Sequence, residues 1–164
     1  MLQKKEKVAI VGLCSDPRFN IIPGPRVEQM RAVLGVDWVV FLTKPGIVRI
    51  YQHGQDGDKE IATHRTVWES DLLIHVVKHH PCVVGIASHE ECGAYHGNNA
   101  MQCKAAIIAA DVLQSRLNNL YDVGLRVIPL FEGRVADDRW RVSRLSTKGT
   151  TSKTVHVRRP ELVY

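Results

Sequence analysis

The sequence predicts a single α/β domain of three layers (α/β/α). Its sheet has a four-stranded parallel core and an antiparallel strand at one edge. Short apolar runs without polar alternation, such as Val8–Leu13 and Cys82–Ala87, are typical of strands covered on both faces. Segments with helical spacing of apolar residues lie between such runs. The length of 164 residues suits one domain.

The first half of the chain alternates strands with one helix. The expected elements are a strand at Val8–Leu13, a helix from Pro25 to Leu34, a strand at Val36–Leu42 and a short strand at Ile47–Tyr51. Pro25 suits the first helical turn because its fixed φ is helical. Gly35 ends the helix because glycine readily adopts a left-handed conformation.

The second half repeats the alternation with longer helices. The expected elements are a helix at His64–His79, a strand at Cys82–Ala87, a helix from about Asn99 to Leu117, a strand at Leu125–Phe131 and an edge strand at Arg139–Leu145. Pro81 stops the first of these helices. Residues 147–164 are rich in Thr, Ser and charge, and we expect an extended C-terminal tail within the one domain, 1–164.

The composition excludes several classes of partner. A net charge of +5 and a pI near 9.2 raise the question of nucleic acid. The positive charges are scattered and no aromatic platform accompanies them, so we expect a solvated basic surface and no nucleic-acid partner. No apolar stretch approaches the roughly 20 residues that span a bilayer, and the charged N-terminus does not resemble a signal peptide. The expected location is cytoplasmic, without a membrane partner.

Four cysteines are present, and they indicate metal binding or packing more than disulfides. Cys14 follows the first strand directly, and His89 lies two residues beyond the run that ends at Ala87, with Cys92 three residues later. No such pattern surrounds the other two, Cys82 and Cys103, which we expect to be small buried hydrophobic residues.

Cys14, His89 and Cys92 are candidate ligands of one zinc ion. Each follows a predicted parallel strand, and ligand sites of open α/β sheets form at the carboxyl ends of the strands. Two thiolates and one imidazole fill three of the four tetrahedral positions of zinc. The fourth position stays open for water, as in catalytic zinc sites.

Three more residues are candidates for the same site. Asp16 and Arg18 are two residues apart on an expected extended loop, so their side chains point the same way and can form an ion pair. Asp16 would then accept a proton or orient an oxygen atom. Gly93 allows the backbone to turn close to the metal and to offer an N–H group to an anionic product.

These residues resemble the motifs of the β-class carbonic anhydrases. That family has a C-x-D-x-R segment after the first core strand, matched by Cys14, Asp16 and Arg18. It has an H-x-x-C segment after a later strand, matched by His89 and Cys92 and followed here by Gly93-Ala94. A looser resemblance extends from about Val8 to about Leu145.

The resemblance implies a zinc lyase that hydrates carbon dioxide reversibly to bicarbonate through a metal-bound hydroxide. Arg18 would hold Asp16 ionised, and Asp16 would accept a hydrogen bond from the zinc-bound water or ligate the zinc itself. Two alternatives remain open: hydrolysis of carbon disulfide or carbonyl sulfide on the same scaffold, and a zinc-binding homologue without hydration activity. Thr43-Lys44-Pro45-Gly46 stands where the family usually has Arg-Asn-Ala-Gly, and this difference keeps the alternatives open.

The resemblance also implies a homodimer or a larger homo-oligomer. The first core strand begins at residue 8, so we expect no N-terminal helical arm of the kind that embraces a partner in many family members. The contact would then come from a sheet edge, from the first helix at Val27–Leu34, or from the C-terminal tail.

Overall fold

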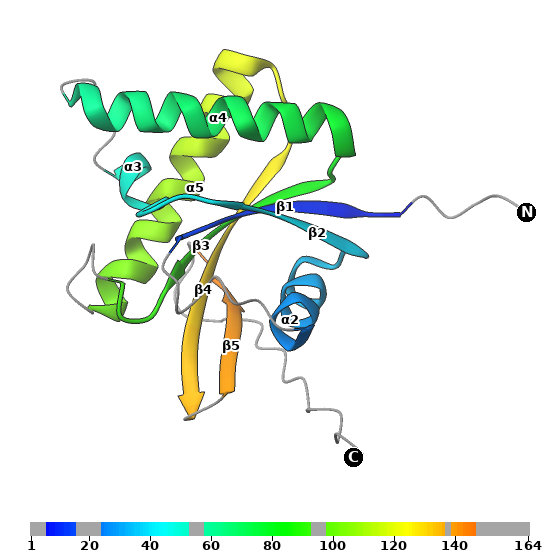
Figure 1. The fold of residues 1–164 in the computed structure, drawn as a ribbon, viewed down its shortest axis with the longest axis vertical. Helices are drawn as coiled ribbons and strands as arrows, with labels where there is room; N and C mark the ends of the chain where they lie inside the picture. The colour runs from blue at the N-terminus through cyan, green and yellow to red at the C-terminus, as the bar shows by residue number, and fades with distance from the viewer. Residues whose placement is uncertain (1–5, 16–23, 53–57, 93–97, 137–138, 147–164) are drawn as a thin grey trace, which may run out of the picture.

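The computed structural model contains one five-stranded sheet with the strand order β2-β1-β3-β4-β5 (Figure 1). It describes residues 6–15, 24–52, 58–92, 98–136 and 139–146, so the predicted C-terminal tail lies outside it. The strands are β1 (Val8–Leu13), β2 (Trp38–Thr43), β3 (Val83–His89), β4 (Arg126–Ala136) and β5 (Arg139–Arg144). The first four are parallel, and β5 is antiparallel to β4. The predicted sheet is therefore confirmed.

Helices cover both faces of this sheet, which confirms the three-layer prediction. They are α2 (Gly24–Leu34), α3 (Arg49–Gln52), α4 (Lys59–His79) and α5 (Asn99–Tyr121). Helix α2 packs on one face, against β2 and β5. Helix α5 packs on β3 and β4 of the other face, α4 contacts β1, and α3 lies against α4 and α5 (Figure 1).

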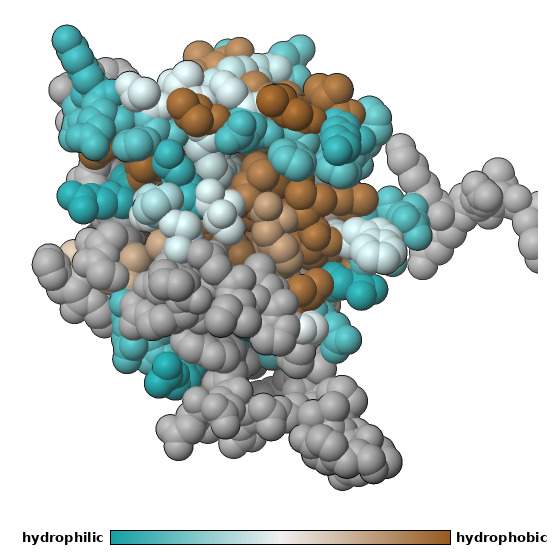
Figure 2. Space-filling view, in the orientation of Figure 1, coloured by the Kyte–Doolittle hydropathy of each residue, from teal (hydrophilic) through white to brown (hydrophobic). Residues whose placement is uncertain are grey.

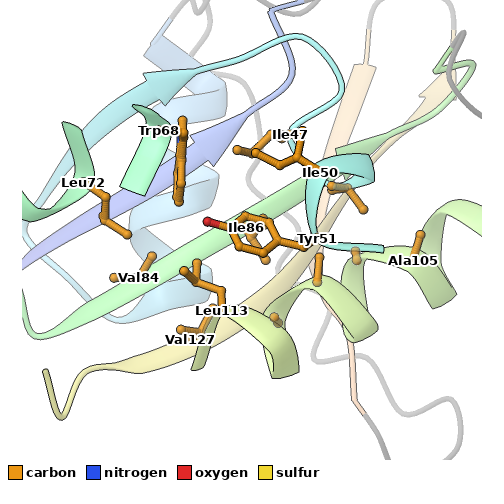
Figure 3. Packing of buried hydrophobic residues seen from close by; sticks show 14 of the residues in the cluster. Ile47, Ile50, Tyr51, Trp68, Leu72, Val84, Ile86, Ala105, Leu113 and Val127 are labelled. Carbon is orange, nitrogen blue, oxygen red and sulfur yellow. The ribbon is translucent and has the colours of Figure 1, made fainter. Parts of the chain in front are cut away.

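Two apolar clusters result from the alternation of side chains along the central strands. Ile10, Val84 and Ile86 point toward α3, α4 and α5. Figure 3 shows Val84 and Ile86 packed near Tyr51 and Leu113. Ala9 and Val11 point to the other side and pack in the cluster that contains Met30 of α2. Both faces of β1 and β3 are therefore buried, as their unbroken apolar sequences predict.

Helix α4 begins earlier than the predicted His64 because Asp58 caps it. The carboxylate of Asp58 accepts hydrogen bonds of 3.1 Å from the backbone N–H groups of Glu60 and Ile61. These groups have no partner inside the helix, so the cap fixes its start at Lys59. Asn98 caps α5 in the same way, through a 3.0 Å bond from the N–H of Met101.

The predicted strand at Ile47–Tyr51 is wrong. Gly46 has a left-handed φ of +59° and starts a turn, and α3 follows at Arg49. The N–H of Arg49 donates to the carbonyl of Gly46 at 2.8 Å, so local bonds replace strand pairing. Ile47, Ile50 and Tyr51 are all buried in this arrangement. A short apolar run fits a buried helical turn as well as a strand, and its length does not distinguish them.

Helix α4 lies close to β1 because Gly12 has no side chain. A Cβ atom at Gly12 would lie 2.8 Å from Cζ2 of Trp68, closer than real contacts permit. Trp68 is 2% exposed and meets the ring of Tyr51 edge to face, with 5.9 Å between the ring centroids. The absence of a side chain at Gly12 therefore sets the distance between the sheet and this helix.

A buried carboxylate, Glu69 of α4, ties the three helices of this layer together. Glu69 is fully buried and accepts hydrogen bonds of 2.6 and 2.8 Å from the guanidinium of Arg116 on α5. It also accepts bonds from the hydroxyls of Tyr121 at 2.7 Å and of Tyr51 on α3 at 3.2 Å. Burial, and then the negative charge of Glu69, raise the pKa of Tyr51 well above its ordinary value. Tyr51 therefore remains a neutral donor.

None of the described helices combines the length and the apolar character that crossing a membrane requires.

We expect Glu69→Gln to lower the free energy of unfolding by about 3 kcal/mol, because it leaves the Arg116 guanidinium without its countercharge. The matched control is Asp71→Asn, which makes the same chemical change at an exposed position of α4 and should alter stability by less than about 0.5 kcal/mol. Urea unfolding at neutral pH measures both. Equal effects of the two variants would contradict a structural role for the Glu69 cluster.

Candidate metal centre

The site lies where two neighbouring parallel strands end. β1 pairs with β3 in a register that sets Gly12 opposite Ile86, so the two carboxyl ends reach the same edge of the sheet. Cys14 is the first residue after β1. Two backbone bonds hold this segment beside the end of β2: Lys44 N–H to Leu13 O at 2.9 Å and Ser15 N–H to Lys44 O at 3.3 Å. The position of Cys14 is therefore fixed by backbone pairing on both sides.

His89 is the last residue of β3, not two residues beyond the strand as predicted, and it is 2% exposed. The strand is longer because β4 continues beside it, with His89 opposite Glu132 and the N–H of Glu90 bonded to Glu132 O at 2.8 Å. The ring Nδ1 lies 2.9 Å from the carbonyl oxygen of Glu90. Nδ1 must be the donor in this bond, because a carbonyl only accepts. Nε2 then carries the lone pair that can bind a metal.

A tight turn returns Cys92 toward the histidine. Glu91, in the turn at residues 90–91, has a left-handed φ of +57°, an uncommon conformation for a residue with a side chain. Cys92 is 6% exposed and packs in the apolar cluster of the α5 side. This turn, through Glu90 and Glu91, brings the side chains of His89 and Cys92 together.

The structure brings the three predicted ligands together. One ligand atom each from Cys14, His89 and Cys92 lies within 4.8 Å of the others, so the cluster could hold a metal ion. Zn–S and Zn–N bonds of about 2.3 and 2.0 Å at tetrahedral angles place such atoms roughly 3.5–3.8 Å apart. Side-chain rotations that move these ligand atoms by about 1 Å would bring them to bonding distance of an ion. Two thiols with one imidazole form a donor set that zinc uses.

A buried ion pair that the sequence analysis missed lies beside the histidine. Arg26 of α2 donates to Oε2 of Glu132, and both side chains are less than a tenth exposed. Burial raises the pKa of Glu132, and the positive charge of Arg26 opposes this rise. The sequence pattern that could have revealed this pair is the single carboxylate of Glu132 in the strand Arg126–Ala136. A carboxylate in a strand whose sheet is covered on both faces requires a buried partner.

The other predicted site residues are only partly tested. Asp16, Arg18 and Gly93 lie outside the described residues. Cys103 is half-buried and burial raises the pKa of its thiol, whereas Cys82 is exposed, so the prediction that it is buried is wrong. Cys82 directly precedes β3, where the chain still runs along the surface.

The segment Thr43-Lys44-Pro45-Gly46, where this chain differs from the family motif, lies wholly within the described residues. Nζ of Lys44 lies 3.0 Å from Nδ1 of His64 on α4, so this lysine is held against the helix.

A surface cavity of about 560 Å³ opens at the opposite, amino-terminal edge of the sheet, lined by charged residues that include Lys7, Glu28 and Asp37. It is therefore separate from the cysteine–histidine cluster.

Comparison with known proteins finds no matching family model, no matching curated protein and no matching solved structure. The resemblance to β-class carbonic anhydrases therefore rests on the motifs around Cys14 and His89.

We expect the purified protein to carry about one zinc ion per chain. Cys14→Ser and Cys92→Ser should each lower the metal content, because a hydroxyl is a much weaker zinc ligand than a thiolate. Cys82→Ser and Cys103→Ser are matched controls and should retain the metal. Elemental analysis after gel filtration measures the content. Full zinc occupancy in both ligand variants would refute the site.

Proposed function

We propose that this chain is a zinc-dependent lyase similar to the β-class carbonic anhydrases, which converts carbon dioxide and water reversibly to bicarbonate. The observation that carries the proposal is the convergence of Cys14, His89 and Cys92 within 4.8 Å at the ends of β1 and β3. Two thiols and one histidine supply three zinc ligands and leave one position for water, the arrangement of catalytic zinc sites.

Bound zinc would supply Lewis acidity, which lowers the pKa of a water ligand from its high value in bulk water toward about 7. The chain supplies the orientation. The carbonyl of Glu90 fixes the tautomer of His89, and the β1–β3 pairing fixes the distance between Cys14 and the other two ligands. Asp16 would accept a hydrogen bond from the attacking water, and Arg18 would keep that carboxylate ionised. The roles of these last two residues rest on the sequence motif.

Stopped-flow measurement of carbon dioxide hydration, on protein of known zinc content, tests the proposal. We expect activity in the parent and its loss in Asp16→Asn, which should keep its zinc. An amide can donate toward the attacking water and cannot take up a proton, whereas a carboxylate only accepts. Asp111→Asn, at an exposed position of α5, is the matched control.

One result would count against this function, and another would count only against the role of Asp16. Zinc binding without hydration by the parent would favour a zinc-binding homologue that lacks the activity. Hydration by Asp16→Asn at the parental rate would leave the metal site intact and remove Asp16 from the mechanism.

We also propose that the functional unit is a homodimer formed through β2. The sheet has two edges, and β5 protects its own with charged residues such as Arg141 and Arg144. β2 (Trp38–Thr43, WVVFLT) has no charged residue and is partly exposed along its length.

A two-fold axis perpendicular to the sheet pairs β2 with its copy and keeps each side chain on its own face. Val40 and Leu42 would then meet their equivalents on one face, and Val39 and Phe41 on the other.

The surface next to this edge is also apolar. Figure 2 shows hydrophobic surface over β2, with further apolar side chains on the outward face of α4. Val67, Ile74 and Val77 of α4 are 51%, 63% and 73% exposed, and their spacing of seven and three residues places them on one stripe. A second copy paired through β2 would bring its own α4 to the same side of the joined sheet.

We expect the double variant Trp38→Lys/Ile74→Lys to be monomeric, because it places charges in this face at positions already more than half exposed. Leu120→Lys/Val135→Lys is the matched control, since it adds the same charge at exposed apolar positions elsewhere. Light scattering measures the oligomeric state of both variants and of the parent, and circular dichroism verifies that all three are folded. A monomeric parent at micromolar concentration would contradict the homodimer.

A further inference from the structure

Two buried polar side chains, those of Gln102 and Ser88, have no hydrogen-bond partner within the described residues. Gln102 is fully buried, and neither its Oε1 nor its Nε2 has a partner within the described residues. Ser88 is 4% exposed, and its Oγ is likewise unpaired within that part of the chain. Burial of such groups is costly unless something fills their hydrogen-bonding capacity. These side chains therefore indicate a binding site for a polar ligand.

Both residues lie on the α5 side of the sheet, at the carboxyl ends of the strands. Ser88 follows Val84 and Ile86 at alternate positions of β3, and those two pack in the cluster formed with α5. Gln102 stands in the first turn of α5, at the start of the buried stripe that continues through Ala105 and Ala109. A helix that connects parallel strands runs back along the sheet, so its first turn lies level with the end of β3.

The same region contains the sulfur ligands. Cys92 is part of this cluster, together with Ala105 and Ala106, and Cys14 packs against it. Figure 3 shows other apolar side chains of this cluster, including Ala105 of α5 and Ile50 of α3. The unpaired amide and hydroxyl therefore lie among apolar side chains, on the side of the sheet from which the two cysteines approach the metal centre.

The donors and acceptors of the two side chains indicate which ligand could pair with them. The amide of Gln102 offers donors and an acceptor in one plane, and the hydroxyl of Ser88 can donate or accept. Carbon dioxide offers only acceptors. Bicarbonate is planar and has two acceptor oxygens and one O–H donor, so it can pair with both ends of an amide.

We infer that Gln102 and Ser88 form the polar wall of the substrate pocket and hold the oxygen atoms of bicarbonate. This inference rests on the proposed function for the identity of the anion, although the polar wall itself is independent of catalysis. The two residues position the anion and take no part in proton transfer. Their removal should therefore raise KM for bicarbonate more than it lowers kcat.

The test compares Gln102→Met with Gln114→Met in the zinc-loaded protein. The control Gln114 is on the same helix but is satisfied: its Nε2 donates to Leu125 O at 2.6 Å and its Oε1 accepts from Val127 N–H at 2.7 Å. Thermal unfolding at increasing bicarbonate concentration gives both the stability without ligand and the Kd. Stopped-flow dehydration of bicarbonate gives KM and kcat.

We expect Gln102→Met to melt no lower than the parent without bicarbonate and to raise Kd and KM about tenfold or more. Ser88→Ala should act in the same direction. Gln114→Met should lower the melting temperature and leave the Kd unchanged.

A Gln102→Met protein with parental Kd and KM, or one destabilised as Gln114→Met is, would show that the amide serves packing or an internal water, and would overturn the inference. Failure to detect bicarbonate binding by the parent would overturn it as well. A parent that binds bicarbonate through Gln102 but does not hydrate carbon dioxide would refute the proposed function alone.

Discussion

The pairing of β1 with β3 brings together the side chains of the candidate metal centre. Cys14 and His89 are far apart in sequence and meet only because the two strands are parallel neighbours, with Gly12 opposite Ile86. A slip of one residue would exchange the two faces of β1, sending Ile10 and Cys14 to the side of α2. The register is protected because both faces of β1 are buried against different helices. The energy that specifies the site is thus the packing energy of the core strands.

The layer on the α5 side is then held by a charge cluster. Glu69 receives hydrogen bonds from Arg116, Tyr121 and Tyr51, so one carboxylate joins α3, α4 and α5. A buried carboxylate is stable only while its donors are in place, which makes the relative position of these helices specific. α3 and the first turn of α5 border the apolar cluster that contains Cys92. By fixing these helices, the Glu69 charge cluster helps to position the residues around Cys92.

The sequence predicted the convergence of Cys14, His89 and Cys92 because each lies next to or close after an element with a clear sequence pattern. Apolar runs located β1 and β3, and the cysteines and the histidine follow them within a few residues. The sequence did not predict α3, since its short apolar run fits a helical turn or a strand equally. Nor did it predict the partners of Glu69 or of Glu132, because these contacts join distant segments and leave no periodic pattern.

The two sides of the metal centre differ in the kind of buried polar group that they contain. On the α2 side, Arg26 and Glu132 neutralise each other, and Gln29 accepts a bond of 2.9 Å from the backbone of Val142. These contacts hold the end of β4, and hence the neighbour of His89, in a fixed position. On the α5 side, Ser88 and Gln102 have no such partners within the described residues. Sequences violate local rules of satisfaction mainly where function requires it. In our proposal the substrate therefore lies on the side of Ser88 and Gln102, and the Arg26–Glu132 pair on the other side supports the strand next to His89.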